Sequence, residues 1–177
     1  VQLGTPNTCN DCHTDRDARW AEKAFFDWYG KRERPHYAET LHAARNQLPG
    51  AGDMLARLAR DPNTPAIVRA TAVAHLAGYL APEYVPILKQ AVRDADPQVR
   101  EAVITAVMTL KPEGRLAVIE PLLADPIRGV RIEAGRALAG IPPQLLNPTQ
   151  RSERDRAVDE YRAAQGSNAD RPESWLN

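Results

Sequence analysis

The sequence predicts an all-α protein in which about three pairs of helices stack as a solenoid. Val68-Arg69, Val99-Arg100 and Val130-Arg131 recur with a period of 31 residues. At the valine of each pair, apolar residues begin to follow the i, i+4, i+8 spacing of one helix face. No stretch alternates apolar and polar residues, so we expect no strand. A fixed period between about 20 and 50 residues is typical of stacked repeats.

A second apolar helix precedes each of the valine-led helices, and an Asp-Pro dipeptide lies between the two. Aspartate can cap a helix N-terminus and proline suits its first turn, so we expect each dipeptide to start the following helix. The apolar residues of these first helices are Leu55 and Leu58; Val85, Leu88 and Val92; and Leu116, Ile119 and Leu123. The dipeptides are Asp61-Pro62, Asp96-Pro97 and Asp125-Pro126.

The segments "DADPQVREAVITAV" and "DPIRGVRIEAGRALAGI" resemble HEAT repeats, and the resemblance covers about residues 53–141. It implies that Arg69, Arg100 and Arg131 bond acidic groups in the turns between repeats. We interpret these three arginines as structural residues. Met108 lies on the second valine-led helix, and we expect it in the core.

Composition divides the chain into three regions. Residues 1–50 hold both cysteines and six of the ten aromatic residues, residues 51–141 form the repeat region, and residues 142–177 are polar. In the last region, "QRSERDRAVDEYRAAQ" predicts an exposed helix after a polar linker. Its Ala-x3-Tyr-x2-Ala spacing, followed by "ADRPESWLN", resembles a truncated tetratricopeptide repeat.

Charge and composition exclude several classes of function. Lys+Arg and Asp+Glu are both 23, so the chain lacks the basic excess of a general nucleic-acid binder. No apolar run reaches the roughly 18 residues of a membrane span. No Gly-rich phosphate loop or catalytic constellation is evident, so we expect a protein that is not an enzyme.

The motif "TPNTCNDCHTD" places Cys9, Cys12 and His13 within five residues. Two thiols at this spacing can each add to one vinyl group of a porphyrin, and the adjacent imidazole can reach the iron from the same side. The sequence therefore predicts covalent attachment of haem c, with His13 as an axial ligand.

Three other interpretations remain open for the motif. A redox disulfide between Cys9 and Cys12 normally follows a strand, and none is expected here. A structural zinc site could combine the two cysteines with His36 and His42, but it would leave His13 idle. Finally, the two residues could be ordinary cysteines, although those usually occupy apolar positions.

Residues 3–45, with "LGTPNTCNDCHTD" and "RPHYAETLHAAR", resemble a module of bacterial multihaem c-type cytochromes in which HEAT-like and tetratricopeptide repeats follow the haem segment. The resemblance implies an electron-transfer module, maturation outside the cytoplasm in the periplasm, and a redox partner protein or neighbouring haem domains. The solenoid would dock partners. The alternative is a non-redox interaction scaffold in which the Cys-His segment holds zinc or is empty.

The surroundings of the motif suggest further haem contacts. A cluster of aromatic residues either shields the haem from water or forms the core of a small helical subdomain. Nearby cationic side chains either pair with the haem propionates or are exposed to solvent. For the second axial position we rank His36 first, His42 second and Met54 third, with a histidine upstream of the chain as a competitor. His75 we expect on a solenoid helix. The aromatic residues are Trp20, Phe25, Phe26, Trp28 and Tyr29, and the cations are Lys31, Arg32 and Arg34.

Overall fold

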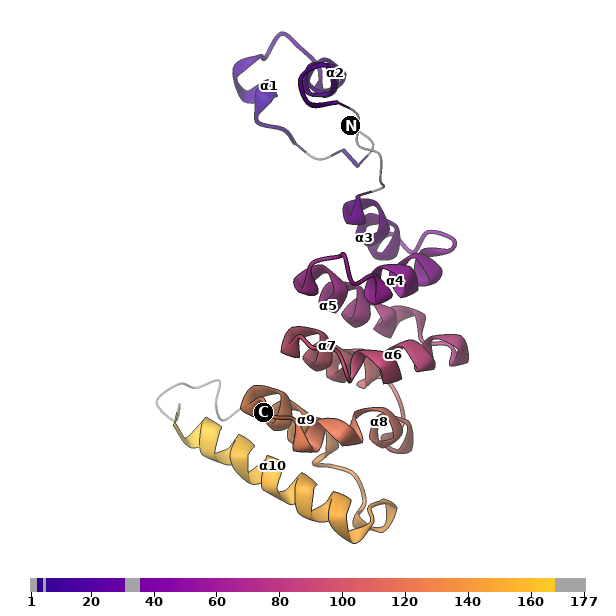
Figure 1. Ribbon diagram of the computed structural model, residues 1–177, viewed down its shortest axis with the longest axis vertical. Helices are drawn as coiled ribbons and strands as arrows, with labels where there is room; N and C mark the ends of the chain where they lie inside the picture. The colour runs from indigo at the N-terminus through magenta and orange to yellow at the C-terminus, as the bar shows by residue number, and fades with distance from the viewer. Residues whose placement is uncertain (1–2, 5, 31–35, 168–177) are drawn as a thin grey trace. The chain divides into compact units, whose positions relative to one another are not determined.

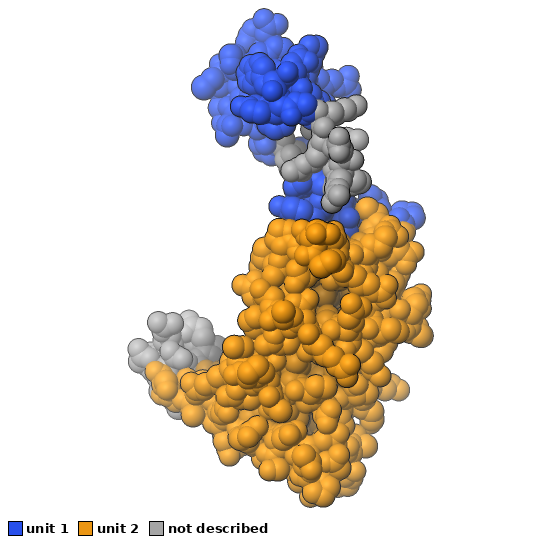
Figure 2. All heavy atoms as spheres, viewed as in Figure 1, with its two compact units in different colours: residues 1–49 blue, residues 50–177 orange. Residues whose placement is uncertain are grey.

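The computed structural model describes residues 3–4, 6–30 and 36–167, and the only regular secondary structure in them is helical, which confirms the all-α prediction (Figure 1). The chain divides into two compact units, residues 1–49 and residues 50–177 (Figure 2). The first unit contains α1 (Cys9–Cys12), α2 (Ala18–Tyr29) and α3 (Tyr37–Arg45). Among the described residues, no helix has the length and apolarity needed to cross a membrane.

The second unit contains the three predicted helix pairs, stacked as successive layers (Figure 1). The pairs are α4 (Ala51–Arg60) with α5 (Ala66–His75), α6 (Val85–Ala91) with α7 (Pro97–Val107), and α8 (Pro112–Ile119) with α9 (Arg128–Leu138). Short 3-10 turns adjoin them at η1 (Leu76–Tyr79), η2 (Pro82–Tyr84), η3 (Glu120–Ala124) and η4 (Pro143–Leu145), and α10 (Pro148–Gly166) follows.

The apolar stripes of α5, α7 and α9 form the core of this unit. All nine stripe residues are buried, and none exposes more than 8% of its surface. They are Val68, Ala72 and Leu76; Val99, Val103 and Val107; and Val130, Ala134 and Leu138. The helical period in the sequence therefore marks the face on which neighbouring pairs stack. Met108 is an exception to the predicted core, because it caps the end of α7 and is 38% exposed.

The Asp-Pro dipeptides start a helix in one pair only. Asp96 caps α7 by accepting a hydrogen bond from the Gln98 amide, with Pro97 in the first turn. α5 begins at Ala66, four residues after Pro62, and α9 begins at Arg128, two residues after Pro126, so the prediction is wrong for these two helices. For α9 the physical reason is a shift of register, since Asp125 lies 31 positions after Asp94 and, like Asp94, binds an arginine instead. For α5, the carboxylate of Asp61 instead accepts hydrogen bonds from the Asn63 amide and the Thr64 hydroxyl.

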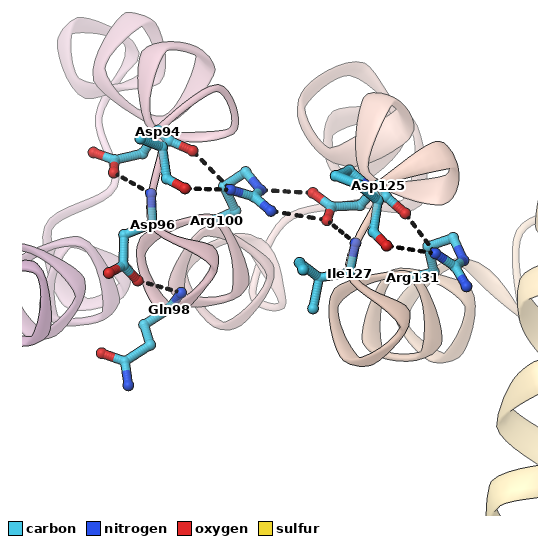
Figure 3. A network of polar contacts seen from close by, with 9 residues as sticks. Asp94, Asp96, Gln98, Arg100, Asp125, Ile127 and Arg131 are labelled. Carbon is cyan, nitrogen blue, oxygen red and sulfur yellow. Dashed lines mark hydrogen bonds and ion pairs between the residues drawn. The ribbon is translucent and has the colours of Figure 1, made fainter.

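Arg100 joins the second helix pair to the third (Figure 3). Its Nε and Nη2 atoms donate to the two carboxylate oxygens of Asp125 at 2.6 and 2.9 Å, and its Nη1 donates to the backbone oxygens of Asp94 and Ala95 at 2.8 and 3.1 Å. Asp125 also accepts from the Ile127 amide at 2.8 Å. The guanidinium therefore binds the backbone of the turn in its own repeat. It also binds the carboxylate of the following repeat through two parallel hydrogen bonds.

A similar ion pair occurs at both neighbouring steps. It confirms the role expected for Arg69 and Arg100, whose partners Asp94 and Asp125 lie between helices. Arg131 differs from the expectation, because its partner lies within a helix and not in a turn. Arg69 donates through Nη2 to Asp94 at 2.8 Å and through Nη1 to the Thr64 oxygen at 2.8 Å. Arg131 donates to Glu160 on α10 at 2.9 Å. We call this series of pairs the arginine ladder.

Helix α10 packs against α9, which differs from the exposed helix expected at this position. Gly135 of α9 makes the approach possible, because a Cβ atom there would lie 2.7 Å from the backbone carbon of Ala157. Ala157 is fully buried, and Arg154 is 9% exposed. The remaining faces of α10 carry the polar residues that dominate its sequence, and α10 covers the end of the stack.

The arginine ladder predicts a pH-dependent stability. Burial alone would raise the pKa of Asp125, but the hydrogen bonds from Arg100 and the Ile127 amide outweigh it and hold that pKa below its ordinary value. Asp125→Asn should therefore cost about 3 kcal/mol of unfolding free energy near pH 7, because it leaves a buried guanidinium without its counter-charge. Asp94→Asn, in the more exposed pair, should cost only about 1–2 kcal/mol.

The sign of the pH effect follows from the lowered pKa. The pair's contribution is complete above the unfolded-state pKa of about 4 and disappears as pH falls through the lower folded-state pKa. Urea denaturation from pH 7 to pH 3 should show the gap between wild type and Asp125→Asn narrowing in acid. A gap that stays constant across this range would contradict the account.

The contact between α9 and α10 is tested by two glycines of the same helix. Gly135→Ala should destabilise the solenoid by about 1–3 kcal/mol, since the added methyl group meets the backbone of α10. Gly129→Ala is the matched control, because a Cβ at that position meets nothing within 4 Å and alanine favours the helix by up to about 1 kcal/mol. Equal thermal midpoints for the two variants would show that α10 does not pack as described.

Candidate functional site

The Cys-x-x-Cys-His segment forms a short, hydrogen-bonded loop. Cys9 and Cys12 are one helical turn apart, so their side chains lie on the same face of α1. The His13 amide donates a hydrogen bond to the backbone oxygen of Cys9 at 2.9 Å. Asn10 holds the turn after the motif, because its Nδ2 donates to the backbone oxygens of Arg16 at 2.8 Å and of His13 at 3.4 Å. Asn7 donates in turn to the Asn10 side chain at 2.7 Å. These two asparagines were not predicted as site residues, because their bonds are visible only once the loop is folded.

Helix α2 supplies the aromatic side of the site. Asp17 caps its N-terminus by accepting from the Trp20 amide at 2.8 Å, and Gly30 ends it with a φ of 77°, which glycine adopts readily. The ring of Trp20 lies 4.7 Å from that of His13, with the two planes tilted by 54°. The cap therefore positions the indole that touches the candidate iron ligand.

Both cysteines and the histidine line one cavity of about 270 Å³. Its wall consists of α2 residues with apolar side chains. The complete lining is Thr8, Cys9, Cys12, His13, Trp20, Ala21, Ala24, Phe25, Trp28 and Tyr29. The cavity thus brings together the three motif residues and four of the five aromatic residues predicted to wall the haem; Phe26, the fifth, lies against Phe25 instead.

The aromatic side chains of this segment are unusually exposed. Trp28 and Tyr29 are each 74% exposed and Phe25 is 55% exposed. Ala21 is the only buried residue in the described part of residues 3–30. A segment this short buries too little apolar surface to be stable alone and normally needs a disulfide, a metal or a prosthetic group. These side chains therefore do not form a core by themselves.

The residues present fit a covalently bound haem. Both thiols are free and exposed, and no nitrogen of the His13 ring has a hydrogen bond to a described residue, so the groups that would react or ligate are available. The apolar wall suits a flat apolar ring. At about 270 Å³, the cavity lies below the range of about 300–1,000 Å³ usual for small-molecule sites, so the described residues would cover the ring only in part.

The other predicted ligands do not line this cavity. His36 caps α3, where its Nδ1 accepts from the Ala38 amide at 3.1 Å and its ring stacks on Tyr37 at 4.0 Å. Nδ1 is thereby occupied, which leaves Nε2 as the only nitrogen that could bind iron. His42 lies on α3 with its Nδ1 3.5 Å from the side chain of Asn46, and Met54 is half-buried on α4. Lys31, Arg32 and Arg34 fall outside the described residues.

The zinc interpretation needs four converging ligands. Within the described residues, no three or more His, Cys, Asp or Glu side chains gather as a set that could hold a metal ion. The structure therefore does not bring Cys9 and Cys12 together with His36 and His42. Covalent haem makes a weaker demand, because its two thiols bond to carbon and only the imidazole needs to reach the metal.

Comparison with known proteins identifies the second unit. A model of HEAT repeats matches residues 51–139, about half of the chain and the whole of the three helix pairs. No curated protein and no solved structure matches the chain. HEAT repeats are typically scaffolds for protein–protein interaction rather than enzymes. The stacked pairs, the buried stripes and the arginine ladder agree with this match, and the chain belongs to the HEAT-repeat family.

Proposed function

We propose that this protein is an electron-transfer module in which a c-type haem is carried on a HEAT solenoid that docks partner proteins. One observation carries the haem half of the proposal. The two thiols and the imidazole of the motif line a single aromatic cavity, in a segment that has almost no core of its own. The HEAT-repeat match supports the docking half.

Each residue of the motif has a separate task. The Sγ–H bonds of Cys9 and Cys12 would add across the two vinyl groups, with carbon–sulfur bonds formed and the hydrogens transferred to the vinyl carbons. A neutral nitrogen of His13 would donate its lone pair to the iron. Trp20 holds the imidazole plane through their ring contact. The bound group supplies one-electron chemistry at a potential set by the axial ligands and by burial.

Two observations on the described residues weigh against the other chemical uses of the motif. A redox Cys-x-x-Cys normally opens a helix after a strand, whereas α1 has four residues and no strand occurs among the described residues. A zinc site lacks a gathered ligand set there. We further propose, from the way c-type haem is attached, that the protein matures and works outside the cytoplasm, in the periplasm.

The second candidate function is interaction alone. The HEAT-repeat match favours it, because the helix pairs have a complete core that does not involve the cysteines. In that case the Cys-His segment would be a zinc-bound or empty appendage. Both candidates share partner docking, and only the content of the segment distinguishes them.

Covalent haem is tested by exporting the full chain in bacteria that carry the c-type maturation system. The wild type should be red, with strong Soret absorption that stays on the protein after acid–acetone extraction. Cys9→Ser/Cys12→Ser should be colourless, and His75→Ala on the solenoid should retain full colour as the control. Colourless wild-type protein under these conditions would leave the scaffold function, and zinc analysis would then separate its two forms.

The second axial ligand is tested on the haem-loaded protein. We rank His36 above His42 and Met54, because Nε2 of His36 has no hydrogen bond to a described residue while its ring is already held by Ala38 and Tyr37. His36→Ala should change a low-spin spectrum to high-spin and allow carbon monoxide to bind, whereas His42→Ala should leave the spectrum unchanged. A low-spin spectrum that survives His36→Ala would remove His36 from this role.

A further inference from the structure

A second cavity lies on the solenoid, between the first and second helix pairs. Its volume is about 850 Å³, and its apolar lining comes from the end of α4, the following turn and the start of α6. Ala59, Pro62, Val85, Pro86 and Ile87 are among these residues. We call this cavity the first groove. Its prolines offer no backbone N–H and restrict the backbone φ at their own positions.

The charged lining of the first groove is mostly cationic. Arg60, Lys89 and Arg93 are exposed, and none of their side chains makes a hydrogen bond or ion pair with a described residue. The only carboxylate in the lining is that of Asp94, which is bound by Arg69 at 2.8 Å. Three positive charges therefore face the groove without a counter-charge.

The positions of these cations are only partly explained by the helices that carry them. Arg60 and Lys89 lie in the last turns of α4 and α6, where a cation complements the helix dipole. Arg93 lies beyond the end of α6, so the helix dipole does not explain its position. The dipole also does not explain why three cations from two helix pairs line the same groove.

The next step of the solenoid lacks this charge. The residues 31 positions after Lys89 and Arg93 are Glu120 and Ala124, and Glu120 accepts from Gln150 at 3.3 Å. The charges of Lys89 and Arg93 are therefore properties of this groove and do not recur at the next repeat. Exposed charge without a counter-charge, next to apolar surface, is typical of a recognition site.

We propose that the first groove binds an acidic segment of a partner protein, whose Asp or Glu carboxylates pair with Arg60, Lys89 and Arg93 while its apolar residues contact the proline-rich wall. Charge complementarity carries this choice of occupant. Nucleic acid is less suited, because phosphate binding needs an extended basic surface and the chain has no net charge. The proposal rests on the docking half of the proposed function and is independent of the haem.

The probe is a library of random 12-residue peptides displayed on phage and selected against the full chain. The groove variant is Arg60→Gln/Lys89→Gln/Arg93→Gln. The matched control, Arg57→Gln/Lys111→Gln/Arg156→Gln, removes three exposed cations that do not line the groove. Circular dichroism establishes that both variants keep the wild-type fold. Selected peptides are then synthesised with a fluorophore and their affinities measured by anisotropy.

Selection should enrich peptides that combine Asp or Glu with apolar residues. Their affinity should fall about tenfold in the groove variant, remain within about twofold in the control, and weaken with added salt. The proposal is overturned if acidic peptides are not enriched, if both variants bind equally, or if a single-stranded DNA 12-mer competes as well as the peptides do. Haem content, measured on the same samples, reports separately on the electron-transfer proposal.

Discussion

The bidentate pair between Arg100 and Asp125 is the contact on which the rest of the solenoid depends. The side chains are 10% and 3% exposed, so each charge is stable there only because the other is present. The guanidinium also holds the backbone of its own turn, which links the local geometry of one repeat to the register of the next. Because the ladder continues to Glu160, the same chemistry that joins the repeats also fastens the polar helix α10 to the end of the stack.

The two units obtain their stability in different ways. The solenoid buries continuous apolar stripes, whereas the segment with the motif buries Ala21 and leaves Trp28 and Tyr29 largely exposed. An isolated helix of the length of α2 is marginal in water, so the proposed haem would add stability to this segment. A covalent haem would supply the missing apolar body at the one place where thiols and imidazole line the same cavity. If haem is attached as proposed, the solenoid is folded before the haem is bound, and the segment with the motif becomes ordered only with it.

The sequence predicts most of the solenoid because a period of 31 residues and an apolar stripe are local signals of a repeated contact. It misplaces the start of α9, because the dipeptide at Asp125 looks like a helix cap, whereas that carboxylate is committed to a distant arginine. The sequence also misses the packing of α10 against α9. That contact depends on Gly135 leaving room for Ala157, and a single glycine produces no periodic pattern in the sequence. In the site, the motif predicts the reactive groups. The hydrogen bonds from the Asn10 side chain to the backbone of the following turn form only in the folded loop, so residue spacing does not predict them.

On the proposed function, the solenoid folds without a cofactor, whereas the motif segment becomes ordered when haem is attached. Amide hydrogen exchange of the full chain, compared with and without covalently attached haem, tests it directly. Residues 18–29 should exchange almost freely without haem and become protected by at least about tenfold with it, while α5, α7 and α9 should be equally protected in both forms. Equal protection of residues 18–29 in the two forms would contradict the account, because it would mean that the segment is complete without a cofactor.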